Sequence, residues 1–318
     1  MIIGEKLNDV DPPPAGLSQR LPAWIRLLRP AQWIKNGVVP AAYLFARWDP
    51  GQMSHAEGFA PFFAEACAVL SFCLVSSCVY IINDWRDREA DALHPAKRLR
   101  PLASGEVSSS QAGMIALGLA LSGFSLPALL LPPAFSGVLA VYLLMQLAYT
   151  FQLKRIPYVD VFVISIGFVL RAVAGATAIS VRISPWLLLC TFLLSLFLAL
   201  CKRRHEKLLL ETDGERHREA LSGYDTRLLD LQIAITASST LVCYAIYTLS
   251  EETVKRFGTT GLGLTIPFVV FGFFRYLELV YRHECGGHPE RVLLTDRVMI
   301  LTVIGYLITV LSVFLSLD

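Results

Sequence analysis

Within the segment 83–91 (NDWRDREAD), Asn83, Asp84, Asp87 and Asp91 each have a side-chain oxygen that could bind a metal. If this segment is helical, Asp84, Asp87 and Asp91 follow one another at intervals of three and four residues and lie on one face. Three carboxylates so close together repel one another unless a cation lies among them. With Asn83 they form the oxygen-only ligand set that Mg²⁺ prefers, which water and substrate phosphates complete. The segment therefore predicts a Mg²⁺ site; the alternative is a solvated helix end neutralised by its own arginines.

Basic side chains follow directly, at His94, Lys97, Arg98 and Arg100. A carboxylate-bound metal beside guanidinium and ammonium groups is the composition expected of a site for a phosphorylated substrate that binds together with Mg²⁺. The alternative is that these charges only anchor the chain at the cytoplasmic side of a membrane. Anchoring explains the basic residues but not their alternation with carboxylates.

The elements that carry these residues are those of a membrane protein. Of the 318 residues, 54% are hydrophobic and 17% are charged, whereas soluble domains have about 25% charged residues. The net charge of +2 is too small to indicate a nucleic-acid partner. The seven cysteines lie mostly in apolar runs, which argues against a disulfide framework. The segment 283–288 (HECGGH) offers one soft ligand, so we interpret it as a glycine-rich loop rather than a metal site.

We expect an all-α integral membrane protein with a bundle of about nine transmembrane helices. Apolar runs of sufficient length occur at 31–47, 62–82, 112–131, 134–152, 158–180, 184–201, 229–250, 261–281 and 298–317. Several are rich in Gly, Ala and Ser, which let membrane helices approach closely. We expect residues 1–26 to form a cytosolic tail rather than a signal peptide, and residues 27–318 to form a single transmembrane catalytic domain.

The distribution of Lys and Arg predicts the orientation in the membrane. Twenty-two of the 28 basic residues fall in the N-terminal segment and in the loops after the second, fourth, sixth and eighth runs. Four fall on the opposite side, and two lie inside the runs. Since cytoplasmic loops carry the excess of Lys and Arg, we expect a cytoplasmic N-terminus and an external C-terminus. The segment 83–100 would then face the cytoplasm from the inner (plasma) membrane.

The segment 83–91 resembles the first aspartate-rich motif of the UbiA superfamily of intramembrane prenyltransferases, whose pattern N-D-x-x-D-x-x-x-D it matches. Nine helices and a site open to the cytoplasm are that family's architecture. Its prenyltransferases carry a second acidic motif after the sixth span, where this chain has the basic segment 202–207 (KRRHEK). That basic segment, with the segments 29–36 (RPAQWIKN) and 158–171, resembles the branch of the superfamily that transfers phosphoribose to polyprenyl phosphates.

The resemblance, which runs from about Leu27 to Tyr224, implies transfer of 5-phosphoribose from phosphoribosyl pyrophosphate to a polyprenyl (decaprenyl) phosphate, with release of pyrophosphate. It implies a step towards polyprenylphosphoryl arabinose for cell-wall arabinan, Mg²⁺ as cofactor, membrane lipid as a partner and a homo-oligomer as one option for assembly. Catalytic and metal-binding roles fall to Asn83, Asp84, Asp87 and Asp91. Substrate-binding roles fall to Gln32, Lys35, Asn36, His94, Lys97, Arg98, Arg100, Asp160, Arg171, Lys202, Arg203, Glu206 and Tyr224.

Charged residues inside the apolar runs need partners. Asp160 and Arg171 are eleven residues apart, about three helical turns, so they share one face at a separation of about 16 Å. A guanidinium in the middle of a span costs at least about 2.5 kcal/mol unless a cavity and an anion offset that cost. We expect Arg171 to bind the lipid phosphate, and the alternative is a structural pair with a carboxylate such as Glu65. Arg275 and Glu278 are expected to form a local ion pair.

Two other functions stay open. Glu211, Asp213 and Glu215 could be a remnant of an acidic motif, which would make the chain a prenyltransferase that uses a polyprenyl diphosphate and an aromatic acceptor. The second alternative is a lipid or metabolite transporter, in which the charges would line a pathway. The concentration of charge at one membrane face favours the enzyme, because transport needs a polar route to the other face.

Overall fold

The computed structural model describes residues 21–93, 97–213, 221, 223–282, 285–287, 292 and 295–316, which form helices and no strands. The longer helices are α4 (Phe59–Ala92), α5 (Ser109–Leu130), α6 (Pro133–Phe151), α7 (Val159–Ala178), α8 (Pro185–Asp213), α10 (Thr226–Leu249), α12 (Ile266–Arg282) and α14 (Arg297–Leu315). The shorter ones are α1 (Ala23–Leu28), η2 (Pro30–Val38), α2 (Ala41–Ala46), α3 (Met53–Ala56), η3 (Lys97–Leu99), η4 (Leu153–Arg155), α11 (Glu251–Phe257), η5 (Gly261–Thr265) and η6 (Cys285–Gly287).

Within this described part of the chain, eight helical segments are long and apolar enough to cross a membrane. They confirm the predicted all-helical membrane fold and correspond to eight of the nine expected spans. The first expected span, 31–47, instead forms the short helices η2 and α2, which meet at Val39 and Pro40. Proline has no N–H to donate and disfavours the helical conformation in the residue before it, so one continuous helix cannot form there.

The chain forms two compact units, which are described separately. The first unit comprises Met1–Lys35 and Leu70–Leu126, and the second comprises Asn36–Val69 and Pro127–Asp318. Helix α4 contributes its first three turns to the second unit and the rest to the first.

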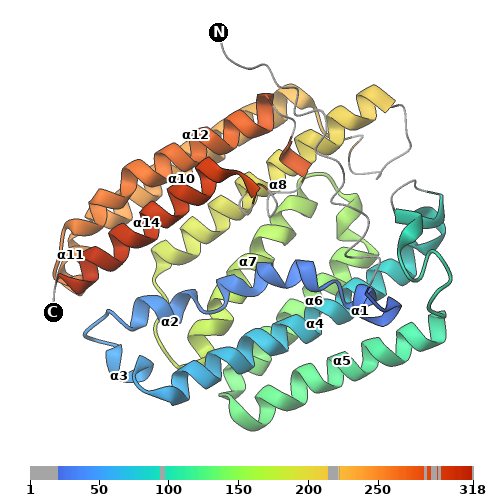
Figure 1. Cartoon of the computed structure of the whole chain (residues 1–318), viewed down its shortest axis with the longest axis horizontal. Helices are drawn as coiled ribbons and strands as arrows, with labels where there is room; N and C mark the ends of the chain where they lie inside the picture. The colour runs from blue at the N-terminus through green and yellow to red at the C-terminus, as the bar shows by residue number, and fades with distance from the viewer. Residues whose placement is uncertain are drawn as a thin grey trace. The chain divides into compact units, whose positions relative to one another are not determined.

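In the first unit, α1 packs against α4 and α5 around a small apolar core. Members of this core from the three helices are Leu27, Cys78, Ile81, Ala112 and Ala116. Helices α4 and α5 lie side by side (Figure 1), and Gly123 allows their close approach, because a Cβ there would lie 2.7 Å from a methyl group of Val75. Only 17% of the α5 span is buried, so most of this helix is available to lipid.

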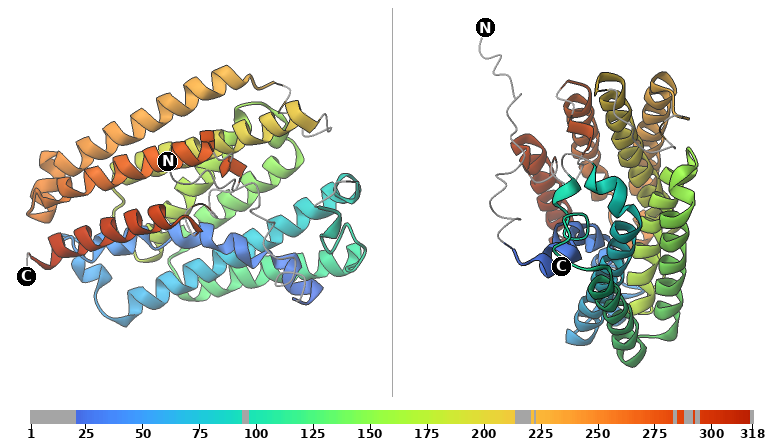
Figure 2. Two further views of the ribbon diagram at one scale, coloured as in Figure 1. Left: turned by 45° about the horizontal axis from the view of Figure 1, so that its top comes forward. Right: turned by 90° about the vertical axis from the view of Figure 1, so that its right-hand side faces the viewer.

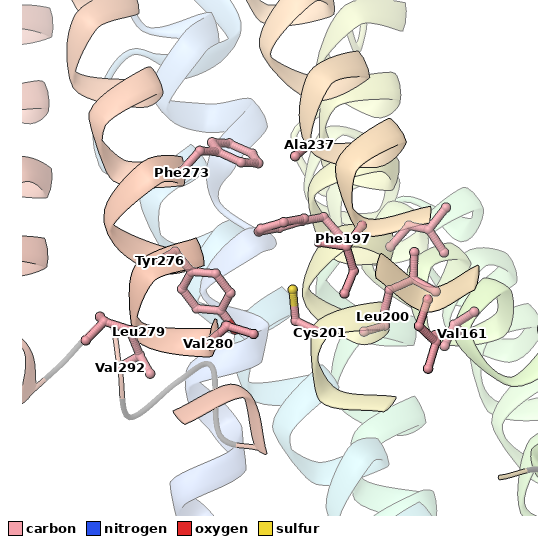
Figure 3. Close-up of a cluster of buried hydrophobic side chains, with 14 of the residues drawn as sticks. Val161, Phe197, Leu200, Cys201, Ala237, Phe273, Tyr276, Leu279, Val280 and Val292 are labelled. Carbon is pink, nitrogen blue, oxygen red and sulfur yellow. The ribbon is translucent and has the colours of Figure 1, made fainter. Parts of the chain in front are cut away.

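In the second unit, helices that follow one another along the chain pack side by side (Figures 1 and 2). Helix α7 contacts α6 and α8, α8 contacts α10, and α12 contacts α14. The largest apolar core lies among α8, α10 and α12, where Phe197 points towards Phe273 and Tyr276 (Figure 3), at ring-centroid distances of 4.9 and 5.5 Å. The α7 span is 56% buried, more than any other span that lies wholly in this unit. The polar residues of α7 therefore meet protein rather than lipid.

Candidate functional site

The carboxylates of α4 that the sequence singles out lie on one side of the helix, and we call Asp84, Asp87 and Asp91 the acidic group. Asp84 is 2% exposed and Asp91 is 4% exposed, and Asp87 is half-buried. The residues between them, at 85, 86 and 88–90, are exposed. This is the pattern that helical spacing predicts, and it turns the carboxylates towards the interior of the first unit.

Two guanidinium groups hold the acidic group. Arg29 donates from Nε to Oδ2 of Asp84 at 3.1 Å, and its Nη2 donates to the other oxygen. Arg100 donates from Nη1 to Oδ1 of Asp84 at 3.2 Å and also to Asp91. One guanidinium therefore lies between two of the three carboxylates, in the place where electrostatics requires a cation.

Arg29 reaches Asp84 because of the turn that ends α1. It adopts the left-handed conformation, with φ of 52°, directly after Leu28. The carbonyl oxygen of Leu28 accepts a hydrogen bond from Oγ of Ser77 at 2.8 Å, and that Oγ accepts one from Nε1 of Trp33 at 2.9 Å. Burial lowers the pKa of the Arg29 guanidinium, and the carboxylate of Asp84 acts in the opposite direction.

Arg29 is a site residue that the sequence reasoning missed. The segment 29–36 supplied a resemblance, but Gln32, Lys35 and Asn36 were chosen from it instead. The available signal was that Arg29 stands between a short apolar run and Pro30. Its partner Asp84 lies 55 residues further along the chain. Gln32 and Lys35 are half-buried in η2. Of the predicted basic cluster, Arg100 binds the acidic group, Arg98 is exposed, and His94 lies outside the described residues.

The acidic group fits a hard divalent cation in its chemistry. Across the described residues, no three His, Cys, Asp or Glu side chains are gathered closely enough to form a metal site by themselves. Mg²⁺ needs only one or two carboxylates when phosphate and water supply the other oxygens. Asp84 and Asp91 already share one cationic partner, so the arrangement accommodates a positive charge between them.

A second polar cluster lies in the second unit, where α7 begins and α8 approaches it. Arg203 donates from Nε to Oδ2 of Asp160 at 2.6 Å and from Nη1 to Glu206. Tyr224 donates its hydroxyl proton to Oδ1 of Asp160 and accepts a hydrogen bond from the backbone N–H of Tyr158 at 2.8 Å. We call Asp160, Arg203, Glu206 and Tyr224 the α7–α8 cluster.

The α7–α8 cluster is almost fully closed to solvent at its centre. Asp160 is 0% exposed and Arg203 is 2% exposed. Burial raises the pKa of the Tyr224 phenol, and the hydrogen bond to Asp160 raises it further. Arg204, which follows Arg203 on α8, donates from Nε to Oδ1 of Asp230 at 2.6 Å. Its guanidinium carbon lies 4.0 Å from the ring centroid of Tyr281. Two of the three basic residues at 202–204 are therefore neutralised by protein carboxylates.

Arg171 lies in the interior of the second unit and is 5% exposed. It donates from Nε to Oδ1 of Asn36 at 2.8 Å, from Nη2 to the hydroxyl of Tyr142 at 2.8 Å, and from Nη1 to the carbonyl of Gly167 at 3.0 Å. The alternative of a pair with Glu65 is wrong, because both carboxyl oxygens of Glu65 are buried without a hydrogen bond. Neutral oxygen atoms bind this guanidinium instead.

Close backbone contact explains why Asn36 reaches Arg171. A Cβ on Gly175 would lie 1.8 Å from the carbonyl oxygen of Val39, so only glycine allows α7 to approach this segment. Gly175 is one helical turn beyond Arg171, and Val39 is three residues beyond Asn36. The contact at Val39 therefore brings Asn36 beside Arg171.

The remaining predicted features fall outside these clusters. Arg275 donates from Nη1 to Glu278 at 2.8 Å, which confirms the predicted local pair, and its Nη2 also donates to Asp296 at 2.7 Å. Hydrogen bonds from Arg275 hold the pKa of Asp296 below its ordinary value. Half of the segment 283–288, namely His283, Glu284 and His288, and the side chains of Glu211, Asp213 and Glu215 lie outside the residues described.

The described helices are those of an integral membrane protein, and arginine side chains bridge carboxylates on one face of α4. Sequence comparison identifies the family. The chain belongs to the UbiA prenyltransferase family, whose model matches residues 50–206. Decaprenyl-phosphate phosphoribosyltransferase of Mycolicibacterium smegmatis is 34% identical over 319 residues, covering 97% of this chain and 96% of that protein. The protein of the same name from Mycobacterium tuberculosis strain H37Rv is 34% identical over 301 residues, covering 95% and 96%.

Solved structures share the fold at lower identity. A UbiA homologue from Archaeoglobus fulgidus, bound to DMAPP and Mg²⁺, superposes with a TM-score of 0.68 and 17% identity. The match covers 92% of this chain and 99% of that one. At this identity the likeness establishes the fold, and it agrees with the all-helical architecture described above.

Proposed function

We propose that the chain is an enzyme that transfers 5-phosphoribose from phosphoribosyl pyrophosphate to a polyprenyl phosphate and releases pyrophosphate. The observation that carries this proposal is the set of ion pairs that Asp84 and Asp91 form with Arg29 and Arg100. The carboxylates are suited to bind a cation, and the guanidinium groups beside them are suited to bind phosphates. Near-full-length similarity to decaprenyl-phosphate phosphoribosyltransferases supports the choice of substrates.

Mg²⁺ is the cation that we propose for the acidic group. Asp84 and Asp87 would hold it, with Asn83 and Asp91 completing or orienting the ligand set. When bound, Mg²⁺ supplies Lewis-acid stabilisation of the charge that develops on the departing diphosphate. Arg100 is suited to exchange a carboxylate for a phosphate oxygen, because a guanidinium binds both with the same planar geometry.

The reaction breaks the bond between the anomeric carbon of ribose and the diphosphate, and the electron pair leaves with the diphosphate. The new bond joins the anomeric carbon to an oxygen of the lipid phosphate. That phosphate is already ionised at neutral pH, so no side chain has to remove a proton. Bond breaking at an anomeric carbon is oxocarbenium-like, so the contribution of the chain is to position two anions and balance their charge.

The basic residues divide into binding and positioning roles. Gln32, Lys35, Lys97, Arg98 and Lys202 are proposed to bind substrate, the basic side chains among them through its phosphates. Arg203 is assigned a positioning role, because Asp160 and Glu206 already neutralise it. We place the enzyme in the inner (plasma) membrane with the acidic group facing the cytoplasm, on the strength of the positive-inside distribution of Lys and Arg.

The experiment that tests this function uses purified protein in liposomes with Mg²⁺, phosphoribosyl pyrophosphate labelled in the ribose, and decaprenyl phosphate. The expected result is label in the lipid fraction and release of unlabelled pyrophosphate. A prenyl diphosphate with an aromatic acid should give no product. Product from the prenyl diphosphate and none from phosphoribosyl pyrophosphate would replace the proposal with an aromatic prenyltransferase.

A further inference from the structure

A small polar pocket lies in the second unit, at the end opposite the α7–α8 cluster. Helix α7 begins at that cluster, and the pocket lies beyond the end of α7 and at the start of α8. The last turns of α10 and α11 and one side of α2 complete it. Its polar lining consists of Gln52, Arg182, Ser184, Tyr247 and Arg256. Among the described residues that line it there is no aspartate or glutamate.

A buried carboxylate beside the pocket holds Arg256 in place. Nε of Arg256 donates to Oδ2 of Asp49 at 2.6 Å, and Asp49 is 4% exposed. Nε2 of Gln52 donates to the same oxygen at 2.7 Å, and the backbone N–H of Gly51 donates to the other oxygen at 3.0 Å. Asp49 is thus satisfied by the protein and uses one of the three guanidinium nitrogens. Both Nη groups of Arg256 remain available for a further acceptor.

The other polar groups of the pocket also have hydrogen atoms to donate. Gln52 links the two sides, because its Oε1 accepts a hydrogen bond from the backbone N–H of Arg182. The guanidinium of Arg182 makes no hydrogen bond or ion pair with any residue that the structure describes, and the same holds for the hydroxyls of Ser184 and Tyr247. Two guanidinium groups and two hydroxyls without a protein acceptor therefore border one pocket, which is the composition of an anion site.

The size and place of the pocket restrict the anion. The space that a water-sized group can occupy is about 20 Å³, somewhat more than the ~10–15 Å³ that one water needs, so the pocket takes one compact group. It lies at the ends of membrane spans, where the phosphate groups of lipids lie. Leu189 and Ile246, which are within one helical turn of the pocket residues Leu187 and Tyr247, are exposed and provide apolar contacts for acyl chains.

We propose that this pocket binds the phosphate group of an anionic phospholipid of the surrounding membrane, an inference that does not rest on the proposed function. The planar guanidinium of Arg182 is suited to a bidentate contact with phosphate, and Arg256 supplies a second cationic donor. Ser184 and Tyr247 would donate to the remaining oxygens. The same donors would accept a soluble phosphate, so the test has to separate the two sources.

The test compares two arginines of the same unit. Arg182→Gln removes a charge that lines the pocket, whereas Arg47→Gln removes an exposed charge that lies 4.0 Å from Glu57 and outside the pocket lining. Native mass spectrometry of the purified chain with dioleoyl phosphatidylglycerol gives the Kd of each protein. We expect Arg182→Gln to raise this Kd about tenfold, since losing one hydrogen bond between charged groups weakens binding by at least that order. Arg47→Gln should match the wild type.

Two further ligands identify what the pocket recognises. Dioleoylglycerol, which lacks the phosphate, should bind weakly and equally to all three proteins. Inorganic phosphate at the concentration of the lipid should leave phosphatidylglycerol bound. Displacement of the lipid by equimolar phosphate would overturn the lipid assignment. A Kd for Arg182→Gln equal to that of the wild type, or an equal rise in Arg47→Gln, would overturn the site itself.

A second variant guards against a loss of folding. The lipid-free Tm of Arg182→Gln should equal that of the wild type, because the backbone N–H that binds Gln52 is retained. Tyr247→Phe keeps the aromatic ring and removes only the hydroxyl, and it should raise the Kd for phosphatidylglycerol about threefold. An unchanged Kd in Tyr247→Phe would exclude the hydroxyl from the site and contradict the proposed arrangement.

Discussion

At the scale of single residues, Asp84 is the carboxylate that both Arg29 and Arg100 bind in the first unit. Both of its oxygens accept hydrogen bonds from Arg29, and Arg100 shares one of those oxygens and links it to Asp91. Loss of the Asp84 carboxylate would leave Arg29 without its carboxylate partner and remove one of two partners from Arg100. Loss of Asp91 would remove one of the two carboxylate partners of Arg100.

We therefore expect Asp84→Asn to reduce kcat by about 100-fold or more, since removing one preorganised electrostatic group typically costs 10²–10³ in rate. Asp87→Ala should behave in the same way, and Asp91→Asn should have a smaller effect. Asp225→Asn is the control, because Asp225 caps α10 through Leu228 and asparagine caps equally well. Steady-state kinetics and Tm on the same preparations give the result. Full activity of Asp84→Asn, or turnover in excess chelator, would remove the metal assignment.

Substitution of Arg171 distinguishes a role in substrate binding from a role in the stability of the fold. All three of its nitrogen atoms donate to protein oxygens, so Arg171→Lys would remove the guanidinium hydrogen bonds to Asn36 and Tyr142. We expect a stability loss of about 2–4 kcal/mol, because a hydrogen bond to a charged group contributes about 1.5–3 kcal/mol, and unchanged KM values in the protein that folds. The readouts are Tm and both KM values. An unchanged Tm with a higher KM for the lipid phosphate would return Arg171 to its predicted role at the substrate.

At the scale of helices, adjacent arginines of α8 make ion pairs of very different burial. Arg203 pairs with Asp160 in the interior, whereas Arg204 pairs with Asp230, whose side chain is 39% exposed. Removing one partner of a buried pair leaves an uncompensated charge, and an exposed pair can be replaced by water. These two residues therefore form a matched test of what joins α7 to α8.

We expect Arg203→Gln to lower the free energy of unfolding by about 3–5 kcal/mol. Arg204→Gln should lower it by only about 1–2 kcal/mol, including its contact with Tyr281. Thermal or denaturant unfolding in one detergent measures both. A loss for Arg203→Gln as small as that expected for Arg204→Gln would mean that the α7–α8 cluster is not a major contributor to stability.

The approach of α7 to the Val39 segment depends on Gly175. We expect Gly175→Ala to displace Val39 and to break the bond between Arg171 and Asn36, with a loss of stability comparable to that of Arg171→Lys. Gly137→Ala in α6 is the control, because its Cβ would meet no atom within 4 Å. Expression level and Tm distinguish the variants, and a fully stable Gly175→Ala protein would contradict the close approach.

At the scale of the whole molecule, the number of membrane crossings decides on which side the C-terminus lies. Eight described segments meet the length and hydropathy of a span. The broken segment from Pro30 to Ala46 would add a ninth crossing, since nine residues of 3₁₀-helix and six of α-helix extend about 27 Å, close to the ~30 Å bilayer core. We expect it to cross.

A C-terminal alkaline phosphatase fusion should accordingly be active outside the cytoplasm, and a C-terminal green fluorescent protein fusion should be dark. An N-terminal fluorescent protein, on the cytoplasmic side, is the positive control. Fluorescence at the C-terminus would mean that the segment from Pro30 to Ala46 enters the membrane and returns, and that both termini lie on the same side.

Features that depend on local spacing could be predicted from the sequence, and features that depend on packing could not. The one-sided arrangement of Asp84, Asp87 and Asp91 follows from helical periodicity, and the spans follow from hydropathy. One partner of Asp84, Arg29, lies 55 residues away, and no periodicity connects them. For Arg171 a rule of opposite charge pointed to the lipid phosphate, with Glu65 as the alternative, but the contact of Gly175 with the backbone of the Val39 segment places a neutral amide beside it.

The α7–α8 cluster also sets an order of events during synthesis of the chain. Arg203 is made 43 residues after Asp160, and Tyr224 is made 64 residues after it. At about 5–20 residues per second, synthesis reaches Arg203 roughly 2–9 s after Asp160. Tyr224 is synthesised later still. During that interval a lone carboxylate in lipid would cost several kcal/mol, so the nascent α7 has to keep its first turn at the water interface. We therefore expect α7 to reach its final packing only after α8 has been translated.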